Sequence, residues 1–405
     1  MKLIRKTAQI DKALLESALV HIERYFQQTR RQQTTDKGSL IGLPYPYIVP
    51  SINNQHFSFE EQYYWDSYFI ARGLDTKNHE TEITGMLDNL IFQFNRFGVI
   101  PNASRLYLTS RSQPPLLTSY INFVADTYNK PKEWQLARMK VAEQEYLNVW
   151  RGTAQPHWRE VYEGLSRYYD INMLHDLAEA ESGWDMTPRF RRKCLDYLPI
   201  DLNSLLYKYE MHFASFYEKL GDHKKTRFWY QNANVRRETI NQLMWSKKRR
   251  FFFDYNYISK KRSDVWSLAA YYPLWVGLVD DTRAKALVNK LKLFRHRGGL
   301  AATSRFTNPE LFGSIHAQWA YPNAWAPLHL IITEGLERYG YNELAADIGL
   351  SFLQSSLVWF DNHHEFLEKY NALKPNKPPA NGLYPTQTGF GWTNSIINIF
   401  AKKYT

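Results

Sequence analysis

Several stretches of the chain place acidic or amide side chains among aromatic residues, which is a costly arrangement unless the polar groups are hydrogen-bonded or functional. The stretches are residues 59–68 (FEEQYYWDSY), 100–115 (IPNASRLYLTSRSQPP), 181–189 (ESGWDMTPR), 318–327 (QWAYPNAWAP), 368–370 (EKY) and 389–394 (GFGWTN). Any one of them could be an aromatic cap over a helix end. Because tryptophan recurs beside a carboxylate or an amide, we interpret the set as parts of one site.

Cleavage of a glycosidic bond is the chemistry that such residues could perform. It requires one carboxylic acid to protonate the leaving oxygen and one carboxylate to act on the opposite face of the sugar. Asp185 directly follows Trp184, and an apolar, aromatic setting keeps a carboxylic acid protonated near neutral pH. Glu368, near the end of an expected long helix, is the candidate for the second carboxylate. The candidates for holding sugar hydroxyls and walling the site are Asp66, Asn102, Arg111, Gln113, Trp65, Trp319 and Trp325.

Composition excludes several other classes of protein. The chain has 405 residues, of which 44% are hydrophobic and 22% charged, as in a globular protein rather than a disordered one. Cys194 is the single cysteine, which excludes a disulfide framework and a zinc site built on two or more thiolates. The net charge of +11 arises from scattered lysines and arginines, so we expect no nucleic-acid partner. Glycine-rich nucleotide loops and a serine-hydrolase elbow are also missing from the sequence.

Two further features concern the setting of the protein. No stretch approaches the 18 uncharged apolar residues of a membrane span, so we expect no membrane partner. The first residues, MKLIRKTAQIDKALLESALVHIERYF, lack the apolar stretch and the small-residue cleavage site of a secretory signal. We therefore expect a cytoplasmic location.

Helical periodicity dominates the elements that must position these residues. After Asp11, the expected N-cap, apolar residues recur at spacings of three and four: Leu14, Leu15, Leu19, Ile22 and Phe26. A second helix is expected from Asp201 to near Gly221, and a short strand hairpin around residues 251–258. Further helices are expected at residues 223–244, 265–278, 281–294, 324–339, 343–360 and 393–402. Without a Pro/Gly/Ser-rich linker or an internal repeat, the pattern predicts one all-α domain of packed helical hairpins, closed as a toroid.

The motifs, in this order, resemble the trehalase family of glycoside hydrolases, family thirty-seven. Residues 59–68 match every fixed position of F-x-E-x-Y-x-W-D-x-Y, which ends the first signature of that family. Residues 318–327 match its second signature, Q-W-D-x-P-x-G-W-A-P, at all but two positions. The other stretches that look like family segments are residues 101–115, 181–185, 201–207, 368–370 and 389–394. The resemblance covers about residues 43–400.

The resemblance implies a six-hairpin α/α toroid, with a catalytic domain at residues 41–405 after an N-terminal helical segment at residues 1–40. It implies inverting hydrolysis of an α-glucosidic bond, with α,α-trehalose as the expected substrate and no metal or organic cofactor. By the same resemblance, Asp185 is the general acid and Glu368 is the base that activates water. The residues expected to bind the sugar are Phe59, Tyr63, Trp65, Asp66, Asn102, Arg111, Gln113, Trp184, Gln318, Trp319 and Trp392.

The chain departs from the family where three charged residues are expected. Ser58 stands at the position of a substrate-binding arginine, Ala320 replaces an aspartate, and Leu383 stands where trehalases have a glutamate that holds the substrate. Ala324 also replaces a glycine. A buried hydrogen bond to a charged group contributes about 1.5–3 kcal/mol. Losing several such contacts would be enough to change the substrate.

A second resemblance bears on that substrate. Residues 164–170 (GLSRYYD), followed by residues 181–190, look like the related family sixty-three hydrolases that act on mannosylglycerate or glucosylglycerate. Arg167 would then replace an arginine that trehalases carry in an intermediate segment. Two alternatives therefore stay open, namely a hydrolase of glucosylglycerate, mannosylglycerate or another small α-glycoside, and a catalytically silent sugar-binding relative. In each case the expected partner is a small carbohydrate.

Overall fold

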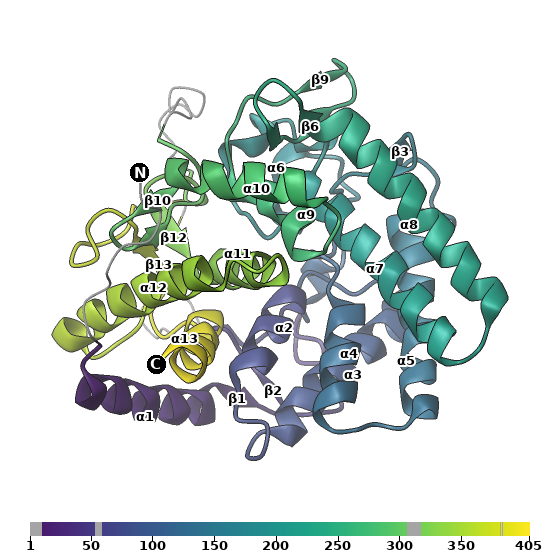
Figure 1. Cartoon of the computed structure of the whole chain (residues 1–405). Helices are drawn as coiled ribbons and strands as arrows, with labels where there is room; N and C mark the ends of the chain where they lie inside the picture. The colour runs from purple at the N-terminus through teal and green to yellow at the C-terminus, as the bar shows by residue number, and fades with distance from the viewer. Residues whose placement is uncertain (1–9, 53–58, 306–316, 381, 383) are drawn as a thin grey trace.

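A computed structural model describes residues 10–52, 59–305, 317–380, 382 and 384–405 (Figure 1). Two of the departures from the family pattern, at Ser58 and Leu383, lie outside these described residues. Helices make up most of the described chain, and the strands are short. The architecture is the all-α toroid that the sequence predicts.

Six helices form an inner ring in which each helix contacts the next and the last contacts the first. They are α2 (Tyr64–Gly73), α4 (Leu117–Thr127), α7 (Ile200–Lys219), α9 (Tyr272–Trp275), α11 (Ala326–Arg338) and α13 (Gly391–Tyr404). The contact between α13 and α2 closes the ring and joins the C-terminal helix to one that begins at residue 64. The site must therefore be assembled from segments far apart in the sequence.

Six more helices alternate with these along the chain and lie in an outer layer (Figure 1). They are α1 (Lys12–Thr29), α3 (Glu80–Phe97), α5 (Lys132–Glu145), α8 (His223–Met244), α10 (Asp281–Lys290) and α12 (Asn342–His363). Each outer helix is followed by an inner one, so the chain forms six helical hairpins around one centre. A short additional helix, α6 (His175–Glu181), belongs to the connection between α5 and α7.

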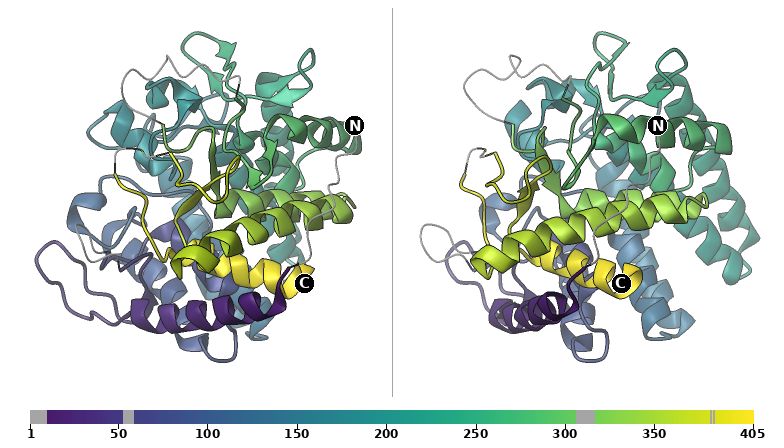
Figure 2. Two further views of the ribbon diagram at one scale, coloured as in Figure 1. Left: turned by 90° about the vertical axis from the view of Figure 1, so that its left-hand side faces the viewer. Right: turned by 60° about the vertical axis from the view of Figure 1, so that its left-hand side comes forward.

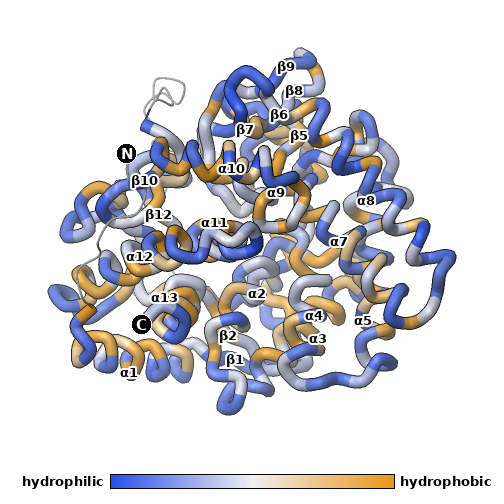
Figure 3. The backbone as a smooth tube through the Cα atoms, viewed as in Figure 1, coloured by the Kyte–Doolittle hydropathy of each residue, from blue (hydrophilic) through white to orange (hydrophobic). Residues whose placement is uncertain are grey.

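The distribution of buried residues explains the two layers. In α2, nine of the ten residues are buried, so this helix packs against neighbours on all sides. In α8, only five of 22 residues are buried, at the three- and four-residue spacing of a single stripe. Figure 3 shows the corresponding hydrophilic outer surface of α8 and the more hydrophobic ring helices. An outer helix such as α8 packs its single buried stripe against the ring, whereas a helix that is buried on all sides, such as α2, is part of the ring.

The N-terminal helix begins where the sequence predicts. The Asp11 carboxylate accepts hydrogen bonds from the amides of Ala13 and Leu14, at 2.9 and 3.1 Å, and so caps α1. The helix then packs on α12 and α13 (Figure 1). The expected separation of residues 1–40 from residues 41–405 stays a prediction.

Several expected helices have different bounds in the structure. Helix α7 begins at Ile200 after Pro199, and the Asp201 carboxylate pairs with Arg189 instead of capping the helix. The helix expected at residues 265–278 is reduced to a 3-10 turn (Leu268–Tyr271) and α9, which ends before Gly277 at φ +75°. The helix expected from residue 324 starts at Ala326, because the preceding residues pair as a strand.

The strands form small antiparallel sheets in the connections between helices. The hairpin expected around residues 251–258 is wrong, because its two strands do not pair with each other. Residues 251–252 (β7) pair with the preceding strand β6, and residues 255–256 (β8) lie between β5 and β9. These strands are β5 (Tyr197–Leu198), β6 (Trp245–Ser246), β7 (Phe251–Phe252), β8 (Tyr255–Asn256) and β9 (Lys261–Arg262). The other pairs are β1 (Arg30–Arg31) with β2 (Tyr47–Ile48), β3 (Glu160–Tyr162) with β4 (Leu165–Ser166), β10 (Arg295–His296) with β11 (Gly299–Leu300), and β12 (Asn323–Trp325) with β13 (Lys369–Asn371).

The connections that carry the suspected site gather at one end of the helices. Figure 2 shows the connection between α12 and α13, together with the β12–β13 pair, on one side of the helical layers. The helices α2 and α13 both begin at this end, at residues 64 and 391. No helix in the described ranges is long and apolar enough to cross a membrane.

Candidate active site

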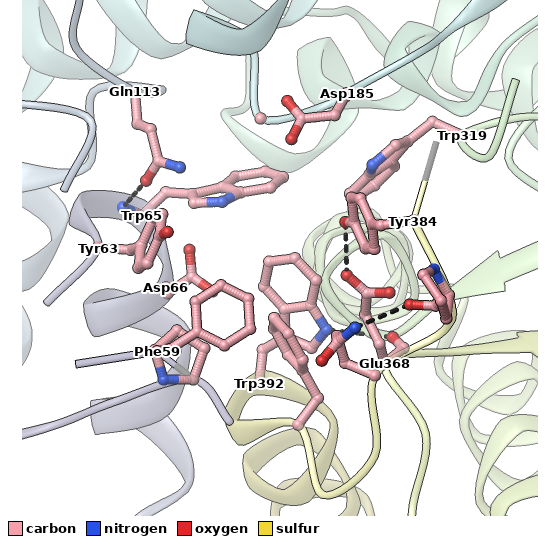
Figure 4. Close-up of a pocket in the computed structure, with 15 residues that line it drawn as sticks. Phe59, Tyr63, Trp65, Asp66, Gln113, Asp185, Trp319, Glu368, Tyr384 and Trp392 are labelled. Carbon is pink, nitrogen blue, oxygen red and sulfur yellow. Dashed lines mark hydrogen bonds between the residues drawn. The ribbon is translucent and has the colours of Figure 1, made fainter. Parts of the chain in front are cut away.

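A cavity of about 510 Å³ lies at the end of the ring where these connections meet (Figure 4). Its lining comes from residues as far apart in sequence as 50 and 392. The lining residues are Pro50, Phe59, Tyr63, Trp65, Asp66, Gln113, Gly183, Asp185, Trp319, Glu368, Tyr384, Pro385, Gln387, Phe390 and Trp392. Ligand pockets in proteins commonly have volumes of about 300–1,000 Å³. The cavity is therefore large enough for a small sugar.

The structure brings most of the residues suggested by the sequence into this one cavity. Those that line it are Phe59, Tyr63, Trp65, Asp66, Gln113, Asp185, Trp319, Glu368 and Trp392. Figure 4 shows Asp185 and Glu368 on opposite sides of the space between the aromatic rings. Two carboxyl groups thus face a single aromatic cavity.

Stacked indole rings build one wall of the cavity. Trp319 lies parallel to Trp325, with ring centroids 3.8 Å apart, and it stacks on Trp184 at 5.1 Å. Trp65 and Trp392 meet edge to face at 5.6 Å and continue the wall. Aromatic rings in contact gain stability beyond the area they bury, which holds the faces in fixed positions. A rigid apolar surface of this kind suits the C–H faces of a sugar ring.

The first turn of α2 presents two polar groups to the cavity. Tyr63 precedes the helix as its N-cap residue, and Asp66 lies in its first turn. The Gln113 side chain accepts a hydrogen bond of 3.0 Å from the Trp65 amide, which fixes the start of the helix (Figure 4). Burial raises the pKa of the Asp66 carboxyl well above its usual value, and the charges of Glu368 and Asp185 raise it further. The raised pKa favours the protonated form of Asp66, which can donate a hydrogen bond to a sugar oxygen.

Asp185 follows α6 through a sharp turn. Gly183 adopts φ +69°, and a Cβ atom there would lie 2.6 Å from the Trp65 ring, so only glycine fits this turn. Burial raises the pKa of Asp185 to about 6, the Arg111 charge opposes this shift, and the Glu368 charge adds to it. A carboxyl group with this pKa holds its proton closer to neutrality than an exposed aspartate does, as a general acid requires.

Glu368 has a different set of neighbours. Its Oε1 accepts a hydrogen bond of 2.8 Å from the Tyr384 hydroxyl (Figure 4), and its Oε2 lies 3.0 Å from the Lys369 ammonium. The Lys369 side chain is fully buried and lies over the Trp325 ring at 5.2 Å. A buried cation at this distance compensates a carboxylate charge, which suits a group that must accept a proton.

The sequence-based prediction that Glu368 lies near the end of a long helix is wrong. Helix α12 ends at His363, and His364 takes the left-handed conformation at φ +54°, which turns the chain out of the helix. Glu368 lies in the bend before β13. Its backbone carbonyl accepts from the Trp392 indole at 3.2 Å, which ties the bend to the first turn of α13.

Besides Trp325, which stacks behind Trp319, five suggested residues lie outside the lining of this cavity. Asn102 donates to the carbonyls of Ser112 and Ala180, so it fastens two of the site loops together. The guanidinium of Arg111 pairs with Asp170 at 3.1 Å, and the Arg167 guanidinium donates to the carbonyls of Trp158 and Leu195. The other two are Trp184, which stacks behind Trp319, and Gln318, which lines a neighbouring cavity.

Buried ion pairs hold the loops that carry Asp185. The Glu181 carboxylate pairs with Arg159 and accepts from the amides of Ser112 and Tyr169, at 2.7 Å each. Such a carboxylate joins three segments because each of its oxygens can accept more than one hydrogen bond. The site loops are thus supported from behind by groups that do not face the cavity.

Tyr384 and Lys369 are site residues that sequence reasoning missed. Both contact the Glu368 carboxylate. Lys369 could have been found from its position directly after Glu368, because a buried carboxylate needs a partner. Tyr384 gave no such signal, since its neighbour Leu383 only marked a departure from the family pattern.

No group of three His, Cys, Asp or Glu side chains within the described residues is placed to hold a metal ion. Ala320 stands where the family pattern has an aspartate, and it provides no carboxylate to the cavity. Its carbonyl accepts a hydrogen bond from the Asn323 amide. The carboxyl groups at the described lining are therefore those of Asp66, Asp185 and Glu368, with the Lys369 ammonium behind Glu368.

Comparison with known proteins shows what this site is similar to. The trehalase family model matches residues 4–179 and 153–405. A periplasmic trehalase of Escherichia coli O17:K52:H18 is 30% identical over 411 residues, covering 91% of this chain and 70% of that protein. A periplasmic trehalase of Shigella flexneri serotype 5b matches with the same identity and coverage. The cytoplasmic location expected from the N-terminal residues is contradicted by these relatives, whose names place them in the periplasm.

Solved structures agree with the sequence relatives. The neutral trehalase Nth1 from Saccharomyces cerevisiae superposes with a TM-score of 0.79 at 30% identity, covering 89% of this chain and 74% of that chain. A GH63 mannosylglycerate hydrolase from Thermus thermophilus, in complex with glucose, shares the fold with a TM-score of 0.68 at 16% identity, covering 95% of this chain and all of that chain. The family match spans nearly the whole chain, and the toroid carries a cavity with two facing carboxyl groups. The chain belongs to the trehalase family and is a glycosidase.

Proposed function

We propose that this chain hydrolyses α,α-trehalose to two glucose molecules with inversion at the attacked carbon, Asp185 serving as general acid and Glu368 as general base. The observation that supports this proposal is the contrast between the two carboxyl groups across one aromatic cavity. Asp185 has a raised pKa because it is removed from water, whereas Glu368 lies 3.0 Å from a buried ammonium. Pairs of carboxyl groups with different environments divide acid and base roles in this way.

The proposed reaction balances in a single displacement. The Asp185 carboxyl gives its proton to the glycosidic oxygen as the C1–O bond breaks, and Glu368 takes a proton from the water that attacks C1 from the other face. The attacked sugar leaves as β-glucose, and the departing sugar keeps its α configuration. The Asp185 carboxylate regains a proton from solvent, and Glu368 releases one.

The remaining lining residues position the attacked sugar. Trp65, Trp319 and Trp392 contribute apolar faces, and the Asp66 carboxyl and the Gln113 amide contribute polar groups at the start of α2. Tyr384 orients the Glu368 carboxylate through its 2.8 Å hydrogen bond. Fixed groups of this kind lower the entropic cost of bringing water and sugar together.

The anomers of the first products test this proposal. Purified protein is mixed with trehalose, and the released glucose is followed by proton NMR before mutarotation. We expect α- and β-glucose in equal amounts, because trehalose supplies one retained and one inverted centre. Release of α-glucose alone would contradict inversion, and binding of trehalose without hydrolysis would instead support a silent sugar-binding relative.

A further inference from the structure

Two turns in the connection between α8 and α9 concentrate positive charge. Within residues 247–262, seven side chains are lysine or arginine and one is acidic. Four of the seven lie in the turn from β6 to β7, and three lie in the turn from β8 to β9 and in β9 itself. All seven are exposed, and we call them the basic patch: Lys247, Lys248, Arg249, Arg250, Lys260, Lys261 and Arg262.

The fold places both turns at one edge of the molecule, although nine residues separate the two clusters in the sequence. Figure 1 shows β6 and β9 beside each other, where α8 ends. The Arg262 guanidinium donates a hydrogen bond of 2.7 Å to the Gln242 carbonyl, which lies in the last turn of α8 and three residues before β6. Two clusters that are short along the chain are therefore one charged region in space.

The carboxylates around the basic patch already have partners. Asp254, the acidic residue between the two clusters, is buried and pairs with Arg189 at 2.8 Å. Asp264 and Asp280 each pair with an arginine outside the patch. Within the part of the chain that the structure describes, no patch residue forms an ion pair. The positive charge is therefore left for an anion outside the chain.

The backbone of the two turns indicates that stability alone does not explain their residues. Arg250 and Lys260 have φ values of +52° and +55°, in the left-handed region. Glycine adopts this conformation without strain, whereas a side chain there destabilises the turn. Both turns thus carry a basic side chain at the position where glycine would be more stable.

Exposed apolar side chains lie beside the basic patch. Ile258, in the second turn, is 63% exposed. Val235 is also 63% exposed and lies seven residues before Gln242, on the same face of α8. The acidic residue of α8, Glu238, directly follows Arg237, so this part of the helix adds no net negative charge. Apolar side chains next to basic ones can insert at the boundary between lipid headgroups and acyl chains, where a soluble polyanion would leave them in water.

A nucleic acid fits this surface less well than a bilayer does. Proteins that hold single strands present aromatic rings on which the bases stack. Between the two basic clusters, residues 251–253 and Tyr255 are buried, and the Tyr257 hydroxyl accepts a hydrogen bond from Arg167. The exposed apolar groups of the region are aliphatic instead, which suits acyl chains.

We propose that the basic patch, together with Ile258 and Val235, is a docking surface for a bilayer that contains anionic phospholipids. The basic side chains bind the lipid phosphates, and the two aliphatic side chains insert between the headgroups. The chain then lies on the bilayer without crossing it. None of these residues lines the active-site cavity. The inference goes beyond the proposed hydrolytic function and does not depend on it.

Flotation of the full chain with lipid vesicles tests this inference. Vesicles of phosphatidylcholine are compared with vesicles in which about a third of the lipid is phosphatidylglycerol, at about 0.05 M and about 0.5 M NaCl. The patch variant replaces four exposed lysines of the patch by glutamine: Lys247, Lys248, Lys260 and Lys261. A matched control replaces four exposed lysines that are dispersed over the rest of the chain: Lys12, Lys77, Lys140 and Lys377.

We expect binding to the anionic vesicles at low salt and none to phosphatidylcholine. Each lysine or arginine near an anionic surface strengthens binding about fivefold, so the patch variant should bind more than about 100-fold more weakly. The control should lose less than about fivefold, because its lysines lie away from the surface. Raising the salt should weaken binding of the unaltered chain, since it screens the charges. Ile258→Ser should weaken binding about fivefold at both salt concentrations, because salt does not screen an apolar contact.

Several outcomes would overturn the inference. The unaltered chain could fail to float with the anionic vesicles at low salt. Equal losses in the patch variant and the control would assign binding to net charge alone. Tighter binding to soluble polyphosphate than to vesicles at equal phosphate concentration, with no effect of Ile258→Ser, would identify a polyanion site instead. Circular dichroism checks folding. If the patch variant does not fold, Lys260→Gln/Lys261→Gln replaces it, with an expected loss of about 25-fold, and unchanged vesicle binding would overturn the inference.

Discussion

Asp185 and Glu368 are both carboxyl groups at the cavity lining, and their neighbours distinguish them. The Arg111 guanidinium, whose charge acts on Asp185, is paired with Asp170, whereas Glu368 is 3.0 Å from the Lys369 ammonium. These contacts lie between segments distant in sequence, except for the adjacent Glu368 and Lys369. The residue types, and the raised pKa of Asp185 beside Trp184, could be predicted from the sequence, but the contacts of Arg111 with Asp170 and of Tyr384 with Glu368 required the folded structure.

Replacing the proposed acid should affect substrates according to their leaving groups. In Asp185→Asn, kcat for trehalose should fall about 10²–10⁴-fold, because the leaving sugar no longer receives a proton. Hydrolysis of α-glucosyl fluoride should be largely retained, since fluoride departs unprotonated. Initial rates with both substrates check this, and circular dichroism confirms folding. Equal losses with both substrates would contradict the role of Asp185 as an acid.

Glu368→Gln should reduce hydrolysis of both substrates by a similar factor, about 10²–10⁴-fold, because each requires an activated water. Retention of the Tyr384 hydrogen bond by the glutamine side chain should preserve the local structure. Rates with trehalose and α-glucosyl fluoride are compared with those of Asp185→Asn. Near-normal rates with either substrate would show that another group activates water.

The pH dependence of kcat/KM should report the protonation of Asp185. The protonated form is the active one, so kcat/KM for trehalose should fall about tenfold per pH unit above a midpoint near 6. Arg111 lowers the pKa of Asp185, so Arg111→Gln should move this alkaline limb to higher pH. Profiles with α-glucosyl fluoride should lack the limb. An unchanged or lower midpoint in Arg111→Gln would refute this electrostatic account.

At the scale of the elements, the sequence predicted the helices that have one polar face. Helix α8 has the predicted bounds, and α1 begins beside the predicted Asp11 cap. Helix α2 could not be recognised in the same way, because nine of its ten residues are buried and its first residues lie in the aromatic stretch at residues 59–68. A helix that is buried on all sides has no single apolar stripe for periodicity to detect. The bend at Glu368 was missed because it depends on the left-handed His364, and histidine is no typical helix stop.

The turn at Gly183 should be sensitive to a single methyl group. Gly183→Ala adds a Cβ 2.6 Å from the Trp65 ring in a residue at φ +69°, so it combines backbone strain with overpacking. Gly221→Ala shares the positive φ, at +76°, but meets open space. We expect Gly183→Ala to lower the free energy of unfolding by about 1–3 kcal/mol more than the control does. Urea denaturation of both variants measures this, and equal losses would contradict the close packing.

At the scale of the whole molecule, ring closure rests on the contact between α2 and α13. A Cβ at Gly73 would lie 2.2 Å from the Ser395 carbonyl oxygen, and the Ser395 hydroxyl donates to the Ile70 carbonyl at 2.9 Å. The toroid itself could be predicted from the helical hairpins and the family motifs. The close approach of these two helices could not, because neither glycine nor serine identifies its partner in the sequence.

Gly73→Ala should therefore destabilise the closed ring. The added methyl group meets backbone atoms, which cannot move aside as a flexible side chain can, so we expect a loss of about 1–3 kcal/mol in the free energy of unfolding. Ser395→Ala, which adds no volume and removes one hydrogen bond, should lose about 0.5–1.5 kcal/mol. Urea denaturation compares the two variants. An unfolding midpoint of Gly73→Ala equal to that of the unaltered protein would show that α2 and α13 do not meet in this register.

The junction of α13 with α2 also determines when the protein can act during its own synthesis. Phe390 and Trp392 complete a cavity whose adjoining lining comes from residues 59–66, more than three hundred residues earlier. While a ribosome is still translating the middle of the chain, Phe59 and Trp65 lack their contacts with Phe390 and Trp392, and the pocket is incomplete. The complete cavity therefore forms only after α13 has left the exit tunnel and docked on α2.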